Sequence, residues 1–243
     1  MLGTERCTFI LERLAQSRSV RVSELAATLQ VDPVTIRRDL ERLEAEGYLH
    51  RVHGGAVLRE NNGAEQPAHN LARRIAETAA RMLPDHSVLF LGPGPLTLEM
   101  VPFLSSKTHL TIITNALDVA WAIAASHPHT LHVIGGQAEE DHGLYNPTQA
   151  VPQIRADWVI LEAKGLDAER GLTDDRASYA HAARALFGLG AQVMELMLPE
   201  QIGHTGVVFI APAEEVDVLI TGREAANAPL WDLSEVGIRV VLT

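Results

Sequence analysis

The sequence is poor in features that would point to several other classes of protein. It has one cysteine, Cys7, so an internal disulfide and a four-cysteine metal site are excluded, and a reducing cytoplasm is expected. It has no uninterrupted apolar run of about 18 residues, so we expect no membrane span. No basic segment followed by a long apolar run appears near its first residues, so we expect no signal peptide.

Positive charge is also scarce, because the 243 residues carry a net charge of −11. Residues 1–58 hold eight arginines and eight acidic residues, which balance, so the whole negative excess falls in residues 59–243. A negative surface repels an anionic polymer. If the chain binds a nucleic acid, we therefore expect the first part to do so.

The chain is long enough for two domains, and composition places the boundary between them. Residues 59–70, RENNGAEQPAHN, are polar, contain Gly63 and Pro67, and show no apolar periodicity. We therefore predict a first domain over 1–58, a linker over 59–70 and a second domain over 71–243.

Apolar spacing predicts two helices and a short strand at the start of the first domain. A helix is expected over about 4–16, a strand over 20–22, and a second helix capped by Ser23. Gln30 and Val31 make a tight connection to a third helix. The buried positions expected on the first two helices are Cys7, Ile10, Leu11 and Leu14, then Leu25, Ala26 and Leu29.

The third helix and a two-stranded ribbon complete the first domain. Asp32 is expected to cap the helix, Pro33 to lie in its first turn and Gly47 to end it. The runs YLHRV and AVL then read as strands on either side of His53, Gly54 and Gly55. The two glycines permit the tight turn of a wing.

The third helix has an apolar face and an opposite face with arginines one turn apart. Ile36, Leu40 and Leu43 share the inner face, and Arg38 and Arg42 point outward. Such a helix, after a second helix and a short turn, is typical of a helix-turn-helix that enters the DNA major groove. The alternative is a solvated helix whose arginines Arg37, Arg38 and Arg42 pair with Glu41, Glu44 and Glu46.

The segment VDPVTIRRDLERLEAEGYLHRVHGGAVL closely resembles the winged helix-turn-helix signature of the DeoR family of bacterial transcriptional regulators. The resemblance implies a regulator, most simply a repressor, that binds a double-stranded DNA operator. Asp32 stands where members usually carry serine, and an acid there repels a nearby phosphate. The residues expected at base edges are Val34, Thr35, Arg38 and Arg42, and those expected at the backbone or wing are Arg37, Arg51, His53, Gly54 and Gly55.

The second domain alternates strand-like and helical runs, which predicts a mostly parallel α/β sheet. Strands are expected at 87–91, 110–114, 131–135, 158–162, 207–211, 218–221 and 239–243, and helices at 71–83, 96–104, 116–126 and 178–188.

The DeoR resemblance extends more weakly over 71–243, through TNALDVA, Gly135-Gly136, KGLDAERGLT and VDVLIT. It implies an effector domain that is similar in fold to ribose-phosphate isomerase and usually senses a phosphorylated sugar. The departures fall where such a ligand is expected to bind. Gly92, Pro93 and Pro95 stand in a loop where members carry an acid and a phosphate cradle, and prolines have no N–H to offer an anion. Further departures are Glu162, Lys164, Ala183, Leu198 to Gln201, and Gly222.

Two hypotheses are open for the second domain. Either Lys164 and Arg176 compensate and a phosphorylated sugar still binds, or the pocket has changed its ligand or no longer senses one. Thr114 and Asn115 belong to the candidate pocket but are also suited to capping the next helix. The candidate effector residues are Gly94, Thr97, Thr114, Asn115, Glu162, Lys164 and Arg176.

Enzymatic and metal-responsive alternatives are weaker. An isomerase needs a carboxylate base, a partner and a phosphate anchor, and only Glu162 with His181 or Lys164 offers such a pairing. His127, His129 and His132, and the run from Glu139 to His142, fit no standard metal spacing. We therefore expect a homo-oligomeric DNA-binding regulator with no catalytic residues, no metal site and no cofactor.

Overall fold

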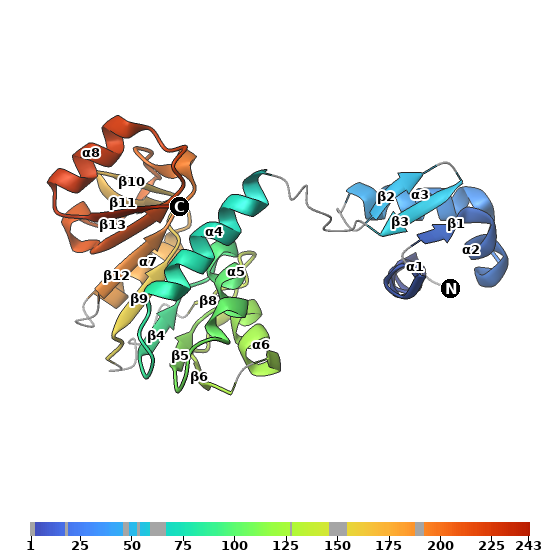
Figure 1. Cartoon of the computed structure of the whole chain (residues 1–243), viewed down its shortest axis with the longest axis horizontal. Helices are drawn as coiled ribbons and strands as arrows, with labels where there is room; N and C mark the ends of the chain where they lie inside the picture. Colours follow the sequence, from blue (N-terminus) through green and yellow to red (C-terminus); the bar gives the residue numbers. More distant parts are fainter. Residues whose placement is uncertain are drawn as a thin grey trace. The chain divides into compact units, whose positions relative to one another are not determined.

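A computed structural model describes residues 3–17, 19–45, 49–52, 54–58, 67–126, 128–145, 155–187 and 192–243. The chain forms two compact units, Met1–Glu65 and Gln66–Thr243, each of which is drawn in Figure 1. No helix among the described residues is long and apolar enough to cross a membrane.

The first unit contains three helices and a small antiparallel sheet. Its elements are α1 (Gly3–Ser17), β1 (Ser19–Arg21), α2 (Val22–Leu29), α3 (Pro33–Ala45), β2 (Leu49–Val52) and β3 (Gly55–Leu58), with strand order β1-β3-β2. The predicted arrangement of helices and ribbon is confirmed. The predicted cap was wrong: α2 follows β1 directly, its N-cap is Arg21 and no side chain caps it. The reason lies in the sheet, because the Val22 amide donates to the Gly54 carbonyl oxygen at 2.9 Å.

The core of the first unit comes from the faces that the apolar spacing predicted. Ile10 and Leu14 of α1 and Ile36, Leu40 and Leu43 of α3 are at most 1% exposed. Cys7, Leu11 and Leu29 are only partly buried and pack at the edge of this core. Burying one helical face in this way fixes which face of α3 remains toward solvent.

The second unit is built on a seven-stranded parallel sheet of order β15-β14-β12-β9-β4-β5-β6. The strands are β4 (Val88–Leu91), β5 (Thr111–Thr114), β6 (Thr130–Val133), β9 (Trp158–Leu161), β12 (Gln192–Leu196), β14 (Val218–Thr221) and β15 (Arg239–Leu242). The helices are α4 (Pro67–Met82), α5 (Pro95–Leu104), α6 (Leu117–Ser126), α7 (Ala177–Phe187) and α8 (Asn227–Glu235), with 3-10 turns at Pro199–Gln201 and Ala213–Glu215. The mixed α/β class with a large parallel sheet is confirmed.

Several elements of the second unit differ from the sequence-based expectation. The helix α4 begins at Pro67, inside the expected linker. The strand β12 was not predicted, and α8 was missed as well. The run at 207–211 forms β13 (Val208–Ala211), which joins an antiparallel sheet with β10 (Gly165–Asp167) and β11 (Gly171–Asp174) and not the central sheet. A two-stranded hairpin, β7 (Gln137–Ala138) and β8 (Leu144–Tyr145), lies outside both sheets.

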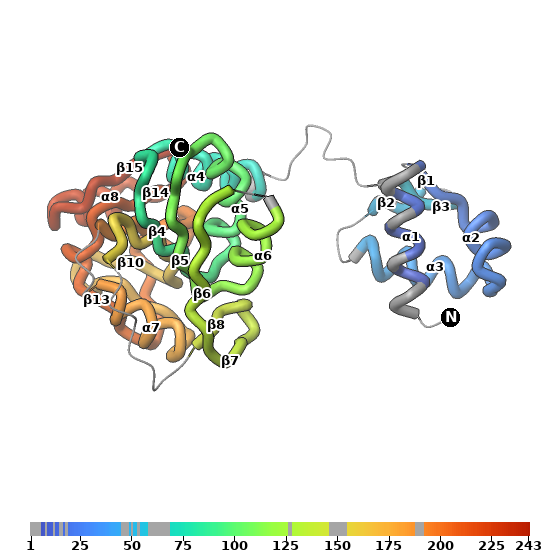
Figure 2. Tube along the Cα trace, turned by 90° about the horizontal axis from the view of Figure 1, so that it is seen from below, coloured from blue at the N-terminus to red at the C-terminus, as the bar shows by residue number. Residues whose placement is uncertain are grey.

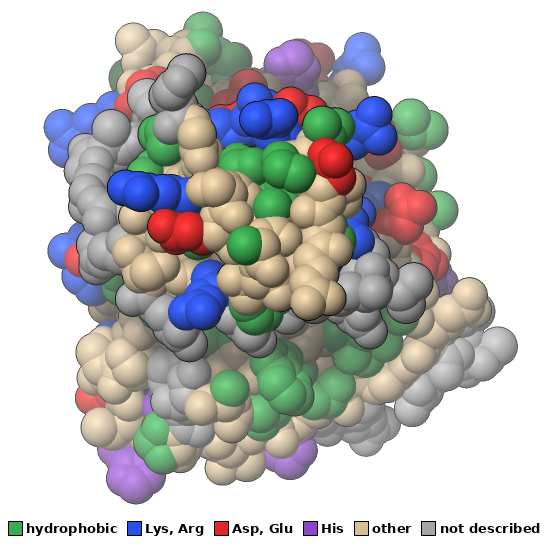
Figure 3. Space-filling model, turned by 90° about the vertical axis from the view of Figure 1, so that its right-hand side faces the viewer, with side chains coloured by type: hydrophobic (Ala, Val, Ile, Leu, Met, Phe, Trp, Pro, Cys, Tyr) green, Lys and Arg blue, Asp and Glu red, His purple; other side chains and the backbone are tan. Residues whose placement is uncertain are grey.

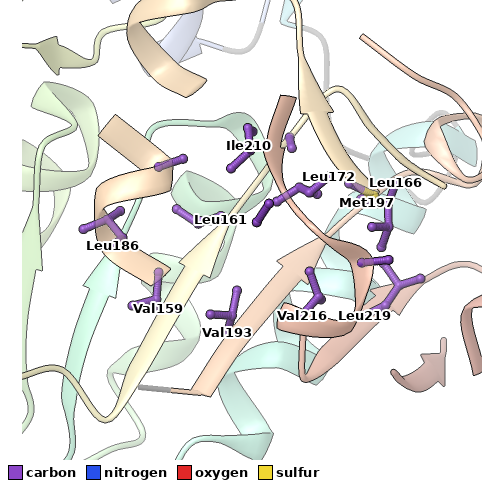
Figure 4. Close-up of a cluster of buried hydrophobic side chains, with 14 of the residues drawn as sticks. Val159, Leu161, Leu166, Leu172, Leu186, Val193, Met197, Ile210, Val216 and Leu219 are labelled. Carbon is purple, nitrogen blue, oxygen red and sulfur yellow. The ribbon is translucent and has the colours of Figure 1, made fainter. Parts of the chain in front are cut away.

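Alternate side chains of the central strands enter two separate cores, as a pleated sheet covered on both faces requires. Leu89, Leu91 and Ile160 pack with α4, α5 and α6. Phe90, Val159 and Leu161 pack with α7, α8 and the antiparallel sheet. Figure 2 shows α5 and α6 on a different side of the sheet from α7 and β13. Figure 4 shows Val159, Leu161, Val193 and Leu186 from β9, β12 and α7 pointing into one shared space.

Candidate functional site

The outer face of α3 presents two arginines to solvent. Arg37 and Arg38 are exposed, and neither has a hydrogen-bond or ion-pair partner among the residues that the structure describes. Val34 is 50% exposed and Thr35 is partly buried on the same N-terminal half of the helix. Arg42 is exposed and does make an interaction. The candidate base-contacting residues therefore share the solvent-facing side of one helix.

The glutamates of α3 bind Arg51 of strand β2 and not the arginines of their own helix. The Glu41 carboxylate accepts from Arg51 Nη1 at 2.8 Å, and the Glu44 carboxylate accepts from the Arg51 amide at 2.8 Å. Both acids therefore hold strand β2 of the ribbon against the helix. The alternative of a solvated helix paired Arg37, Arg38 and Arg42 with Glu41, Glu44 and Glu46. Glu41 and Glu44 bind Arg51 instead, and Glu46 lies outside the described residues.

The first turn of α3 is capped by the residue directly before the helix, Asp32. Asp32 Oδ1 accepts from the Val34 amide at 2.7 Å, which confirms Asp32 as the N-terminal cap. At the other end of the unit, Arg6 of α1 makes a two-pronged contact with Asp39 at 2.7 and 3.1 Å. This pair is mostly shielded from solvent and ties α1 to α3.

Gly54 and Gly55 of the wing are each required to be glycine, for different structural reasons. Gly54 has φ of +84°, a conformation that L side chains rarely adopt, and Gly55 lies so close to β1 that a Cβ would overlap the Val20 carbonyl. The other two residues assigned to this region, His53 and Gly47, lie outside the described residues. Figure 3 shows that basic and acidic side chains are interspersed on the face in view.

A pocket of about 440 Å³ lies in the second unit at the point where the strand order reverses. From β4 the chain continues through β5 and β6 in one direction, and from β9 it continues through β12, β14 and β15 in the other. Ligands of open parallel sheets bind at such switch points, outside the carboxyl ends of the strands. The pocket lining comes from Ala72, Pro93, Gly94, Pro95, Leu96, Glu162, Ala163, Lys164, Asp174, Asp175, Arg176, Leu198 and Gln201.

Glu162 is the central side chain of this pocket. It follows β9, is 8% exposed, and its carboxylate Oε1 accepts from the Thr97 amide at the first turn of α5. Burial raises the pKa of Glu162 to about 7, and the amides of Thr97 and Leu96 partly oppose that rise. Thr97 closes the turn further, since its hydroxyl donates to the carbonyl oxygens of Gly92 and Gly94 at 2.8 Å.

Arg176 is held by carboxylates of its own chain. Its guanidinium makes two 2.8 Å hydrogen bonds to Asp174, which is almost fully buried, and a 2.7 Å bond to Asp141. It also stacks over the Tyr179 ring, 4.0 Å from the centroid. Lys164 is exposed at the pocket rim, and its backbone amide donates to Asp174 at 3.0 Å.

A second carboxyl lies behind the first and was not predicted from the sequence. Glu195 of β12 is fully buried, and its Oε2 accepts from the Ala163 amide at 3.2 Å. Its Oε1 has no hydrogen-bond partner among the described residues. Burial raises the pKa of Glu195 to about 8, with Glu162 and Asp174 adding to the rise. Burial therefore favours the protonated form of Glu195 at neutral pH, whereas Glu162, with a pKa of about 7, is only partly protonated there.

The structure divides the predicted effector residues. Gly94, Glu162, Lys164 and Arg176 line one pocket, and Thr97 binds Glu162. Thr114 at the end of β5 and Asn115 directly after it are buried, and neither is among the lining residues. Thr114 Oγ1 donates to the Leu91 carbonyl at 2.7 Å and accepts from the Ala116 amide at 3.0 Å, as a local cap does. Asn115 donates to the Leu144 carbonyl of the hairpin at 3.2 Å.

The structure offers little to the enzymatic and metal alternatives. His181 is exposed on α7, and within the described part of the chain it makes no hydrogen bond or ion pair with Glu162. Among the described residues, no group of three or more histidine, cysteine or acidic side chains is placed to hold a metal. His129 bonds the Leu104 carbonyl at 3.1 Å, and His142 contacts Asp118 at 3.3 Å. His127 lies outside the described residues.

Comparison with known families agrees with this geometry. A family model described as the DeoR C terminal sensor domain matches residues 68–223, and a model described as a DeoR-like helix-turn-helix domain matches residues 6–62. The chain belongs to the DeoR family. It is a DNA-binding transcriptional regulator, with α3 as the second helix of its helix-turn-helix and the pocket inside its sensor domain.

Relatives within the DeoR family match nearly end to end. The transcriptional repressor AccR of Agrobacterium fabrum is 27% identical over 228 residues, 89% of this chain and 88% of the relative. The regulator GolR of Listeria innocua is 28% identical, over 99% and 98%. The glycerol-3-phosphate regulon repressor of Escherichia coli is 28% identical, over 91% of each. A solved transcriptional regulator from Streptococcus pneumoniae overlaps 73% of this chain and 90% of its own, with a TM-score of 0.43 and 11% identity.

The positions that depart from the usual DeoR pattern now have structural roles. Leu198 lines the pocket, and Gln201 donates to the Ala163 carbonyl at 3.0 Å. Gly222 lies against Leu71 of α4, so a larger residue there would clash. Ala183 of α7 is buried in the core. Among the departures, Lys164 adds a positive charge at the pocket rim, and Leu198, Gln201, Gly222 and Ala183 add none.

Proposed function

We propose that this DeoR-family regulator is a repressor that binds a double-stranded DNA operator in the cytoplasm. The names of two relatives, the AccR repressor and the glycerol-3-phosphate regulon repressor, support repression over activation. In this proposal Val34, Thr35, Arg38 and Arg42 contact base edges, and Arg37 and Arg51 contact the DNA backbone. His53, Gly54 and Gly55 form the wing beside it.

One observation carries the proposal. The arginines Arg37 and Arg38 are exposed and unpaired within the described residues, whereas Glu41 and Glu44 are bound to Arg51. A helix built only for stability would pair its own charges at i+3 and i+4. Here Arg37 and Arg38 are left for an anion from outside, and a guanidinium is suited to guanine O6 and N7 or to phosphate.

The test is operator affinity of the Arg38→Ala variant on the DNA upstream of the protein's own gene. We expect a loss of about 1–3 kcal/mol at matched salt, because a base-edge contact is removed. The control is Arg81→Ala, which removes an exposed arginine of the sensor unit and should leave affinity unchanged. Equal affinities of wild type and Arg38→Ala would contradict the assignment.

We further propose that two or more copies present their α3 helices to repeated half-sites, since one small domain has limited reach. Sedimentation velocity at working concentration should give a species larger than 26.4 kDa. A monomer that still binds operator tightly would contradict this part of the proposal.

The switch-point pocket is the proposed effector site. It is lined by residues from both halves of the sheet and has convergent polar groups, as small-molecule sites do. Binding there is proposed to change the affinity for DNA, and no enzymatic activity is assigned to it.

A further inference from the structure

The first turn of α5 is the part of the pocket suited to an anion, and its donors are already used. Gly94 is the N-cap and carries no side chain, and Pro95 has no N–H. The next two amides, of Leu96 and Thr97, both act on the Glu162 carboxylate. A ligand phosphate would need these same donors.

The Glu162 carboxylate also fills the space over this turn. A Cβ on Gly94 would overlap the Glu162 carboxyl group, so the two groups are already in close contact. Glu162 is more than nine-tenths buried, so its carboxyl group is held against this turn and not in solvent. The position is therefore closed by both volume and hydrogen bonding.

The remaining charges of the pocket do not compensate for this. The lining has three acids, Glu162, Asp174 and Asp175, and two cations, Lys164 and Arg176. Arg176 is bound to two carboxylates, Asp174 and Asp141, so its charge is more than neutralised locally. Only Lys164 remains without an ion-pair partner among the described residues, and it is exposed.

We infer that Glu162 occupies the anion position of this pocket, and that the effector is an unphosphorylated polyhydroxyl compound. Hydroxyl groups donate to carboxylates, which the pocket supplies, and they need no cluster of positive charge. A phosphate ester would be repelled by Glu162, Asp174 and Asp175 and would find no free amide at α5. The inference rests on the proposed role of the pocket as the effector site.

The test is isothermal titration with inorganic phosphate, at an ionic strength held constant with chloride. Wild type should show no saturable binding up to the highest phosphate concentration used. Glu162→Gly should bind phosphate with a dissociation constant at least about tenfold below that concentration, because two amides and their space are freed. Glu162→Ala is the second variant, in case the glycine change disturbs folding. Absence of a gain in both folded variants would overturn the inference.

Glu162→Gln is the matched control, because it removes the charge but keeps the volume and an acceptor oxygen. It should not gain phosphate binding. If Glu162→Gln gained as much phosphate affinity as Glu162→Gly, the claim that the Glu162 side chain fills the phosphate position would be wrong. The weak phosphate binding of wild type would then come from charge repulsion alone. Saturable binding to wild type as tight as to Glu162→Gly would overturn the inference outright.

Operator release separates the ligand class from the proposed function. Compounds that release wild type from its operator should be unphosphorylated, and release by a phosphorylated sugar but not by its free sugar would contradict the inference. Failure of wild type to bind any operator would defeat the proposed function, and the phosphate titrations would still stand as a test of Glu162.

Discussion

The helices α3 and α5 both begin with a proline, but the amides of their first turns are bound by different kinds of acceptor. Each has a proline at its first position, Pro33 or Pro95. The first turn of α3 is capped by Asp32, its immediate neighbour, through the Val34 amide. The first turn of α5 has no local side-chain cap and receives Glu162, which lies 65 residues further along the chain.

The difference determines which charges remain available. A local cap completes α3 without using its outer face, so Arg37 and Arg38 are left for an anion outside the protein. At α5 a distant carboxylate supplies the anion internally, and Arg176 is likewise bound by acids of the same chain. Under the two proposals, the first unit therefore leaves arginines free to meet an external phosphate, and the second fills the start of α5 with its own carboxylate and excludes phosphate.

The contact at α5 can be broken from the glycine side. Gly94→Ala should destabilise the sensor unit by about 1–3 kcal/mol, because the new Cβ overlaps the Glu162 carboxyl group. In a Glu162→Gly background the same change should cost much less. A double-mutant cycle by urea denaturation measures the coupling. Equal costs in the two backgrounds would show that the close approach of Gly94 and Glu162 is not energetically important.

The buried acids predict a pH dependence of the second unit. The folded-state pKa of Glu195 is raised to about 8 from a usual 4.5, so the folded state holds a proton that the unfolded state has lost between those values. Stability should therefore fall as pH rises through this window, by up to about 1.4 kcal/mol per pH unit. Glu162 acts in the same direction up to about pH 7.

Thermal unfolding at several pH values tests this in wild type and Glu195→Gln. The variant cannot ionise, so its curve should be flatter, and it should gain stability over wild type as pH rises toward 8. Parallel curves for the two proteins would mean that Glu195 is not the group that titrates.

The smallest expected effect is loss of the local cap on α3. Asp32→Ala should destabilise the first unit by about 1 kcal/mol, because the Val34 amide loses its acceptor. Asp32→Asn retains a capping oxygen and is the control. Denaturation curves that show equal losses for alanine and asparagine would assign the effect to charge and not to capping.

Local signals were enough to predict the first unit. Asp32 and Pro33 mark the start of α3, and the spacing of Ile36, Leu40 and Leu43 gives its buried face, which the structure confirms. Ser23 failed as a cap because pairing of β1 with β3, a non-local event, places the start of α2 at Val22.

The pocket was only partly predictable, since it depends on contacts between distant segments. Glu162, Lys164 and Arg176 were candidates from the family resemblance, but nothing in the sequence pairs Glu162 with Thr97. Strand β12 escaped prediction because Gln192 and Glu195 interrupt its apolar pattern, although Glu195 is fully buried. A buried ionisable residue is the least predictable part of a strand, because its burial depends on partners elsewhere in the fold.

The most direct test of the contrast between the two units is operator affinity measured across a salt series for wild type and Arg38→Ala. If the outer face of α3 receives DNA, the logarithm of affinity should fall steeply with the logarithm of salt concentration, by about 0.9 per neutralised phosphate. The variant should lie below wild type throughout the series. An affinity that is independent of salt, or two coincident lines, would contradict the assignment of α3 as the DNA-binding helix.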